Sequence, residues 1–252
     1  MRAKKVLLTL LVLLAALALS SCAGSPGFEA PGVTLSVSPD GSPEEVSTGV
    51  QLIVLLTVLS LAPAILVLAT SFTRIVIVLS LLRTAIGTPT VPPNQIIIGL
   101  SLLLTFFIMA PVYQQVDQQA MQPYLAGEID QETAFERGAA PVREFMFKQT
   151  RQKDLELMLE MHGSGRPETL DDIPTVVLLP AFVISELRSA FIMGFMIYVP
   201  FLVIDLVVSS ILLAMGMMML PPSLISLPFK LLLFIMVDGW YLIVRSLAQS
   251  FM

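Results

Sequence analysis

Long uncharged stretches separated by short polar breaks run through most of the chain. Residues 50–73 and 96–110 carry no charge, and turn-forming glycine and proline residues lie between them at 87–93. An α-helix rises about 1.5 Å per residue, so about 20 apolar residues are enough to cross the hydrocarbon core of a membrane. This pattern predicts a first apolar helical hairpin over residues 50–112.

Apolar residues return at residue 173 and continue almost to the end of the sequence. The uncharged run Met215-Gly216-Met217-Met218-Met219-Leu220-Pro221-Pro222 lies between apolar arms of about 186–215 and 223–251. Its glycine and prolines favour a turn, so we expect a second apolar hairpin over residues 173–252. The expected fold class is all-α, with four long apolar helices in two membrane-associated hairpins.

Charged residues are concentrated between the two hairpins. Residues 113–172 hold twelve acidic and six basic side chains, which is 18 of the 33 charges in the chain. Apolar residues recur there at helical spacing from Glu132 to Met161, so we expect amphipathic helices in a polar domain over 113–172. The net charge of −5 reflects this acidic domain and gives no indication of a nucleic-acid partner.

The N-terminal residues have the pattern of a secretory signal peptide. Arg2, Lys4 and Lys5 precede an apolar run and several small residues, which predicts a signal peptide over residues 1–23. Cys22 follows Leu19-Ser20-Ser21, an arrangement resembling a lipoprotein processing box, so its thiol is a candidate for acylation. The alternative is an idle cysteine or one removed with the signal. Residues 24–49 are rich in Pro, Gly and Ser and predict a flexible leader.

The distribution of basic residues suggests an orientation in the membrane. We place Arg74 and Arg83 at the first hairpin turn, and they assign this turn to the cytoplasm, because basic residues are enriched on that side. A signal peptide starts the mature chain outside, which agrees with that assignment. Alternation then places residues 113–172 outside the cytoplasm, while Arg188 and Arg245, near outer helix ends, depart from the rule.

Charged residues also occur inside the apolar arms of the second hairpin. Asp205 and Lys230 are equally far from the middle of the methionine-rich turn, so a symmetric hairpin would bring them together as an ion pair. The same mirror relation brings Glu186 near Arg245. Such pairs can hold the register of the hairpin or join copies of an oligomer. A proton or ion path through Asp205 and Lys230 is the functional alternative.

The methionines of the turn, Met215, Met217, Met218 and Met219, are the most distinctive candidate site. Methionine is unbranched and polarizable and repacks around irregular surfaces, which suits a deformable seal. The plainer interpretation is that these side chains face lipid or fill a core.

The residues needed for catalysis or metal binding are scarce. The chain has one histidine and one cysteine, and its sequence has no Ser/His/Asp set, no metal-ligand spacing and no phosphate-binding glycine loop. We therefore predict a protein that is not an enzyme and has no catalytic, cofactor-binding or metal site. An ion- or proton-coupled carrier or channel is the alternative function, although no internal repeat of the kind common in transporters is evident.

Three segments resemble the FliP family of flagellar export-gate proteins, called SctR in virulence type III secretion systems. They are Ser71-Phe72-Thr73-Arg74 continuing to Pro93-Asn94-Gln95, Pro180-Ala181-Phe182-Val183-Ile184-Ser185-Glu186-Leu187, and Tyr198-Val199-Pro200 continuing through Asp205 to the methionine-rich turn. The resemblance covers about residues 50–252, nearly all of the expected mature chain.

This resemblance implies a pore-forming subunit of the flagellar type III protein export gate, in the bacterial inner membrane at the flagellar basal body. It implies a homo-oligomer of five copies, joined by the FliQ and FliR subunits and other export-apparatus proteins. Unfolded proteins would be the substrates. The four methionines of the turn would form a gasket around the pore.

Overall fold

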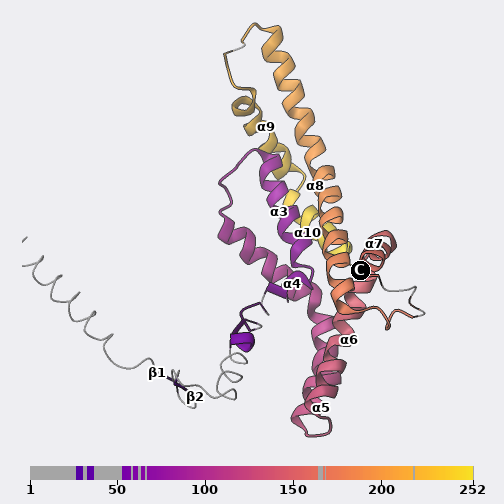
Figure 1. The fold of residues 1–252 in the computed structure, drawn as a ribbon. Helices are drawn as coiled ribbons and strands as arrows, with labels where there is room; N and C mark the ends of the chain where they lie inside the picture. Colours follow the sequence, from indigo (N-terminus) through magenta and orange to yellow (C-terminus); the bar gives the residue numbers. More distant parts are fainter. Residues whose placement is uncertain are drawn as a thin grey trace, which may run out of the picture. The chain divides into compact units, whose positions relative to one another are not determined.

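Helices make up most of the regular structure in the computed structural model, which describes residues 27–30, 33–36, 53–57, 59–61, 64–65, 67–163, 167, 169–217 and 219–251. The chain divides into two units, residues 1–60 and 61–252, and each is described by itself. Figure 1 follows the order of the elements along the chain.

The first unit contains two short strands. Strand β1 (Gly27–Ala30) pairs antiparallel with β2 (Val33–Ser36), with Ala30 opposite Val33. This strand pair lies within residues 24–49, where we expected a flexible leader. The predicted signal peptide and Cys22 lie outside the described residues, so both stay predictions.

The second unit begins with a helical hairpin. Helix α3 (Phe72–Ile86) is joined to α4 (Asn94–Val116) by a turn in which Gly87 has a left-handed backbone with φ 89°, a conformation that glycine adopts without strain. Helix α4 continues through a π-helical turn, η1 (Asp117–Met121), into α5 (Gln122–Leu125). The helix therefore extends about four turns beyond residue 112, into the segment expected to be the polar domain.

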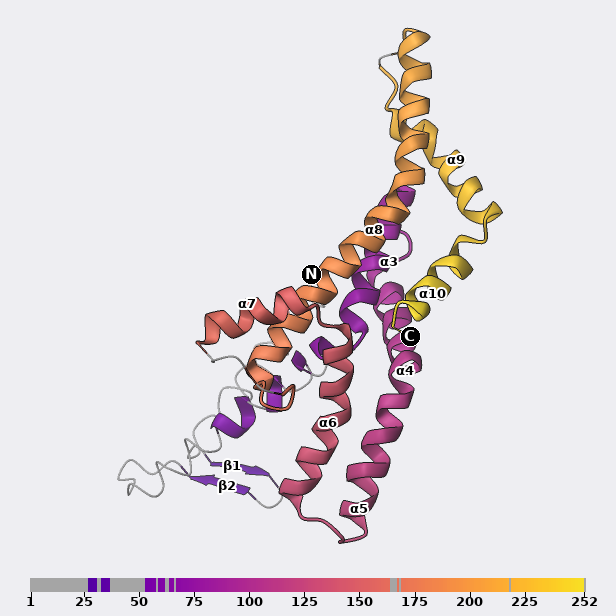
Figure 2. The same cartoon turned by 90° about the vertical axis from the view of Figure 1, so that its right-hand side faces the viewer.

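Amphipathic helices were expected between residues 132 and 161, and the structure has two helices there. Helix α6 (Gln131–Gln149) runs back along α4, and α7 (Gln152–His162) packs against α8 (Thr175–Ala214), as Figure 2 shows. Asp130 caps α6, because its carboxylate accepts a 3.0 Å hydrogen bond from the backbone N–H of Thr133.

The second hairpin differs from the prediction in both arms. Helix α8 spans 40 residues and begins eleven residues before the expected start at Glu186. Pro180 and Pro200 lie inside it. A proline removes one backbone hydrogen bond, but in an apolar setting the remaining bonds favour a kinked helix over an ended one.

The returning arm is broken, where we had expected one helix over 223–251. Helix α9 (Pro222–Met236) and α10 (Gly239–Gln249) meet at an angle of 64°. Asp238 adopts a left-handed backbone with φ 51°, which ends α9. A Cβ on Gly239 would lie 2.2 Å from the ring of Phe234, so the close packing at this break requires glycine.

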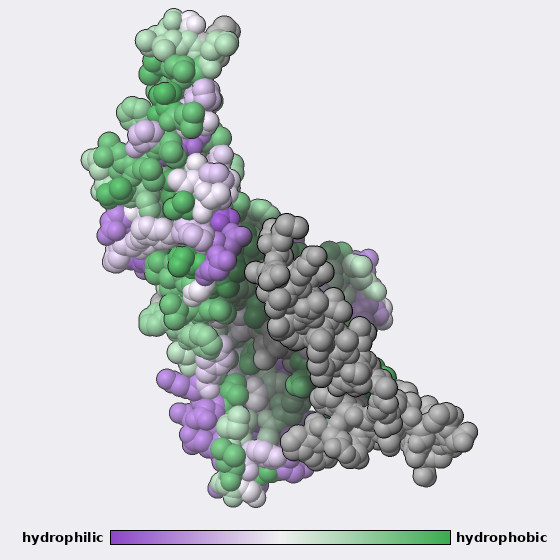
Figure 3. All heavy atoms as spheres, turned by 90° about the vertical axis from the view of Figure 1, so that its left-hand side faces the viewer, coloured by the Kyte–Doolittle hydropathy of each residue, from purple (hydrophilic) through white to green (hydrophobic). Residues whose placement is uncertain are grey.

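Two described helical stretches are long and apolar enough to cross a membrane, residues 94–125 and 175–214, and the bent pair α9–α10 would make a third if it forms one span. The expected count of four apolar helices therefore stays a prediction, since residues 50–73 are described only in part. Hydrophobic side chains cover most of the α8–α9 end of the face seen in Figure 3.

Two apolar clusters hold the second unit together. One joins α3, α8 and α10 through residues such as Ile75, Ala190 and Leu247, and the other joins α4, α6 and α8 through Met109, Phe145 and Phe182. Helix α8 contributes to both clusters, so it connects the first hairpin and α10 with the helix α6 of the polar domain.

Candidate functional site

The methionine-rich turn lies at the end of the α8–α9 hairpin that is farthest from α5 (Figure 1). Met215 ends α8, and Gly216 follows with φ 75°, the left-handed conformation that reverses the chain. The N–H of Met217 donates to the carbonyl of Leu212 over 2.9 Å, which closes the turn. Two prolines then start α9, where their missing N–H groups need no partner.

The methionine side chains of this turn are open to the surroundings. The exposed fraction is 66% for Met215, 40% for Met217 and 98% for Met219, while Met218 lies outside the described residues. Because the turn carries no charge, it presents a flexible apolar surface.

Asp205 and Lys230 lie together on facing arms of the hairpin. Lys230 Nζ is 2.6 Å from Asp205 Oδ2, and the lysine side chain is 6% exposed while the aspartate side chain is 34% exposed. The hydroxyl of Ser226 donates to Asp205 Oδ1 over 2.6 Å, and Lys230 also donates to the carbonyl of Ala85 over 3.3 Å. The pair therefore joins α8 and α9 to the last turn of α3.

Sequence reasoning missed both additional partners of this pair. Ser226 lies four residues before Lys230, on the same face of α9, so helical spacing could have found it. Nothing in the sequence marks the carbonyl of Ala85, because any residue has one and only the tertiary packing brings it to Lys230.

Glu186 forms its ion pair with Arg74 instead of Arg245. The buried guanidinium of Arg74 binds both carboxylate oxygens of Glu186, with Nε 2.9 Å from Oε2. The predicted pairing of Glu186 with Arg245 assumed a straight returning arm, and it fails because the break at Asp238 turns α10 away from the direction of α9. Arg245 is exposed and has no ion pair within the part of the chain that the structure describes.

Arg74, on α3, contacts groups from three other parts of the second unit. Besides Glu186 on α8, it donates to Gln149 at the end of α6 over 3.0 Å and to the carbonyl of Ser250 after α10 over 2.9 Å. Its guanidinium also lies 3.9 Å from the ring centroid of Phe251. We call Arg74, Glu186, Gln149, Ser250 and Phe251 the arginine hub.

The assignment of Arg74 to the first hairpin turn is therefore wrong. It lies in the first turn of α3, and the helix carries the chain twelve residues further before the hairpin turn begins at Gly87. Arg83 does lie at that turn, where it donates to the carbonyl of Pro92 over 3.2 Å and to Asn94 Oδ1 over 2.6 Å.

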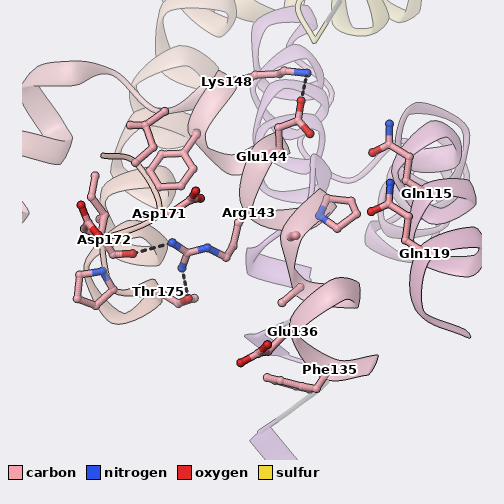
Figure 4. A pocket seen from close by; sticks show the side chains of 17 residues that line it. Gln115, Gln119, Phe135, Glu136, Arg143, Glu144, Lys148, Asp171, Asp172 and Thr175 are labelled. Carbon is pink, nitrogen blue, oxygen red and sulfur yellow. Dashed lines mark hydrogen bonds and ion pairs between the residues drawn. The ribbon is translucent and has the colours of Figure 1, made fainter. Parts of the chain in front are cut away.

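The polar domain contains an open cavity of about 1140 Å³ between α4–η1, α6 and residues 170–175 (Figure 4). Arg143 crosses it and donates to Thr175 Oγ1 and to the carbonyl of Ile173, and the Glu144–Lys148 ion pair lies at its edge. No group of three metal-ligating side chains occurs among the described residues. Apolar and polar side chains both line the cavity, and the contacts of Arg143 tie α6 to the start of α8.

Comparison with known proteins decides the family. The sequence profile described as the FliP family matches residues 55–247, which is most of the chain. The chain belongs to the FliP family. The resemblance found in the sequence is thereby confirmed, and the FliP-type segments include α3, both arms of the second hairpin and the methionine-rich turn.

Several FliP proteins are similar over nearly their whole length. The flagellar biosynthetic protein FliP of Bacillus subtilis is 55% identical over 217 residues, covering 86% of this chain and 98% of that protein. The protein of the same name from Pectobacterium carotovorum is 52% identical over 236 residues, covering 94% and 91%. FliP of Borreliella burgdorferi is 47% identical over 211 residues, covering 82% and 83%.

Proposed function

We propose that this chain is a pore-forming subunit of the flagellar type III protein export gate, which passes unfolded flagellar proteins across the bacterial inner membrane. Its place would be the flagellar basal body. Membership of the FliP family supports a role in flagellar biosynthesis, because the similar proteins carry that role in their names.

The observation that carries the proposal is the exposed, uncharged methionine-rich turn at the free end of the α8–α9 hairpin. Several such turns around one axis form a narrow apolar constriction, which resists wetting when it is empty. Thioether side chains can repack around many different side chains, so one seal admits many substrates.

The proposed assembly is a homo-oligomer of five copies together with FliQ and FliR. The long exposed apolar faces of α4 and α8 support assembly within a membrane, since few of their side chains are covered in the single chain. The chain itself is assigned no catalysis, and the energy for transport would come from other parts of the export apparatus.

A leak measurement tests the seal. We expect the triple change of Met217, Met218 and Met219 to Ala, in the complex with its co-expressed partners, to make the membrane permeable to small ions while the complex still assembles. The physical reason is that truncating the thioethers widens the constriction and lets water in. Ion flux into vesicles or cells, measured with a membrane-potential dye, gives the result.

Matched controls come from methionines in the same hairpin. Met196 and Met236 are about as exposed as Met215 but lie away from the turn, so Met196→Ala and Met236→Ala should leave the membrane sealed. An equal leak from the controls, or none from the triple variant, would overturn the seal. If the chain were instead a carrier working through Asp205 and Lys230, the triple methionine variant would change the rate of transport without opening an unselective leak.

A further inference from the structure

The charged residues of α3, α8, α9 and α10, together with the residue that precedes α10, fall into two groups. Five are bonded within the chain, namely Arg74, Arg83, Glu186, Asp205 and Lys230. The side chains of the other three are exposed and form no hydrogen bond or ion pair in the described ranges, namely Arg188, Asp238 and Arg245. Charges in apolar helices are costly when unpaired and usually face protein or water.

Asp238 stands at the break between α9 and α10 with an exposed side chain. The residues around it are apolar or aromatic and also exposed, namely Ile235, Met236, Val237, Trp240 and Tyr241. A helix break leaves backbone groups without intrahelical partners, and hydrocarbon cannot satisfy them. A Cβ at Gly239 would clash with Phe234, and the exposed Asp238 carboxylate stands at this break among apolar side chains.

Arg188 carries the opposite charge on a different helix and is also exposed. It lies on α8, two residues after Glu186, and its exposed neighbours Phe191 and Ile192 form an apolar surround similar to that of Asp238. In Figure 2, α8 and α10 lie on either side of α3. The two charges therefore belong to helices on either side of α3.

We propose that Asp238 of one copy forms an ion pair with Arg188 of the next copy, so that the α9–α10 break is covered by α8 of the neighbour. This proposal rests on the oligomeric pore proposed above and names the contact that builds it. When copies follow one another head to tail around an axis, each contact joins two different surfaces of the same chain, and the α9–α10 break and α8 are two such surfaces. Arg245 meets this condition less well, because it lies on α10 itself.

The arginine hub limits how far successive copies are shifted along the helices. Arg74 joins Glu186 to Ser250, so these residues lie at one level. Asp238 precedes Ser250 by twelve residues, so it lies at most about 18 Å from the level of Ser250, toward the methionine-rich turn. Arg188 follows Glu186 by two residues, so it lies about 3 Å from the level of Glu186, also toward that turn. Within one copy the levels of Asp238 and Arg188 therefore differ by at most about 15 Å, and neighbouring copies that pair these residues are shifted by no more than this distance along the helices.

A charge exchange in the co-expressed complex tests the pair. We expect Asp238→Arg and Arg188→Asp each to lower the assembled fraction at least about tenfold, because each leaves two like charges facing one another. The double variant should return the assembled fraction to within about twofold of the original. Native mass spectrometry of the purified complex counts the copies.

The matched control uses the other unpaired arginine. Arg245→Asp should leave assembly unchanged and should not rescue Asp238→Arg. Rescue by Arg245→Asp, or a double variant no better than the weaker single variant, would overturn the assignment to Arg188. Unchanged assembly in both single variants would mean that Asp238 is solvated at the membrane surface, which also overturns it.

A crosslinking measurement is independent of how well the charge variants fold. Copies carrying Asp238→Cys with one tag and copies carrying Arg188→Cys with another are co-expressed and treated with a bifunctional maleimide. We expect crosslinks between the two tags, and copies without either substitution report the background from Cys22. If oligomers form but this crosslink is absent, only the proposed contact is contradicted. If the chain never forms oligomers, the proposed pore is contradicted as well.

Discussion

Lys230 is a charged side chain in an apolar helix, and it is almost fully removed from solvent. Its ammonium group is stabilised by Asp205 on the facing helix and by the carbonyl of Ala85 at the end of α3. Asp205 in turn accepts a hydrogen bond from Ser226. Removing Lys230 leaves Asp205 partly buried without its cation, and such a loss costs more than the pair itself contributes.

We expect Lys230→Met to lower the free energy of unfolding by about 2–3 kcal/mol, below the usual range for a fully buried pair because the Asp205 side chain is partly exposed. Thermal unfolding in detergent measures the change. Exchanging the charges, with Asp205→Lys and Lys230→Asp together, should recover part of the loss. Direct pairing is wrong if the exchanged variant is no more stable than either single variant.

At the scale of one element, the N-cap residue Asp130 stabilises the start of helix α6. The hydroxyl and the backbone N–H of Thr133 both bond the Asp130 carboxylate and hold the pKa of that carboxyl below its ordinary value of 3.8. The charged cap therefore stabilises the start of α6 fully at pH values above 3.8, and this stabilisation is lost as the pH falls through the lower pKa of the folded state.

We expect Asp130→Ala to speed the hydrogen exchange of the Thr133 and Ala134 amides several-fold at neutral pH, because the first turn of α6 loses its cap. Asp130→Asn is the matched control, since its amide oxygen still accepts the bond but does not titrate. It should keep most of the protection and lose the dependence on acid. Equal exchange in all three proteins would exclude the cap.

At the scale of the whole second unit, the arginine hub joins segments that are far apart in the sequence. Arg74 lies 112 residues from Glu186 and 176 residues from Ser250, yet one guanidinium binds both. Both side chains of the ion pair are buried, so each depends on the other to remain charged inside the protein.

We expect Arg74→Met to lower the free energy of unfolding by about 3–5 kcal/mol, because Glu186 is left buried without a cation. The ends of α6 and α10 should also lose protection from hydrogen exchange, since both are tied to Arg74. Arg245→Met removes an exposed arginine with no bond in the described residues and should change stability by less than about 0.5 kcal/mol. A local effect confined to α3 would contradict the joining role.

The sequence by itself determined the elements whose signals are local. Uncharged length and turn residues located the α3–α4 and α8–α9 hairpins, helical spacing located α6 and α7, and equal distance from the turn paired Asp205 with Lys230, because two antiparallel helices keep their register near the turn that joins them. The same reasoning failed farther away. The length of α8 depends on packing around its prolines, and the break at Asp238 depends on the contact between Gly239 and Phe234.

Only the tertiary structure decided the partner of Glu186. Once α10 turns away at the break, Arg245 leaves the path that a straight helix would follow, and Arg74 from the first hairpin takes its place. Composition and periodicity act over a few turns of one helix, whereas an ion pair between residues 74 and 186 requires α3 and α8 to be packed against one another. The methionine-rich turn is different, because its position and its uncharged character were already present in the sequence, although only the structure showed that its side chains are exposed.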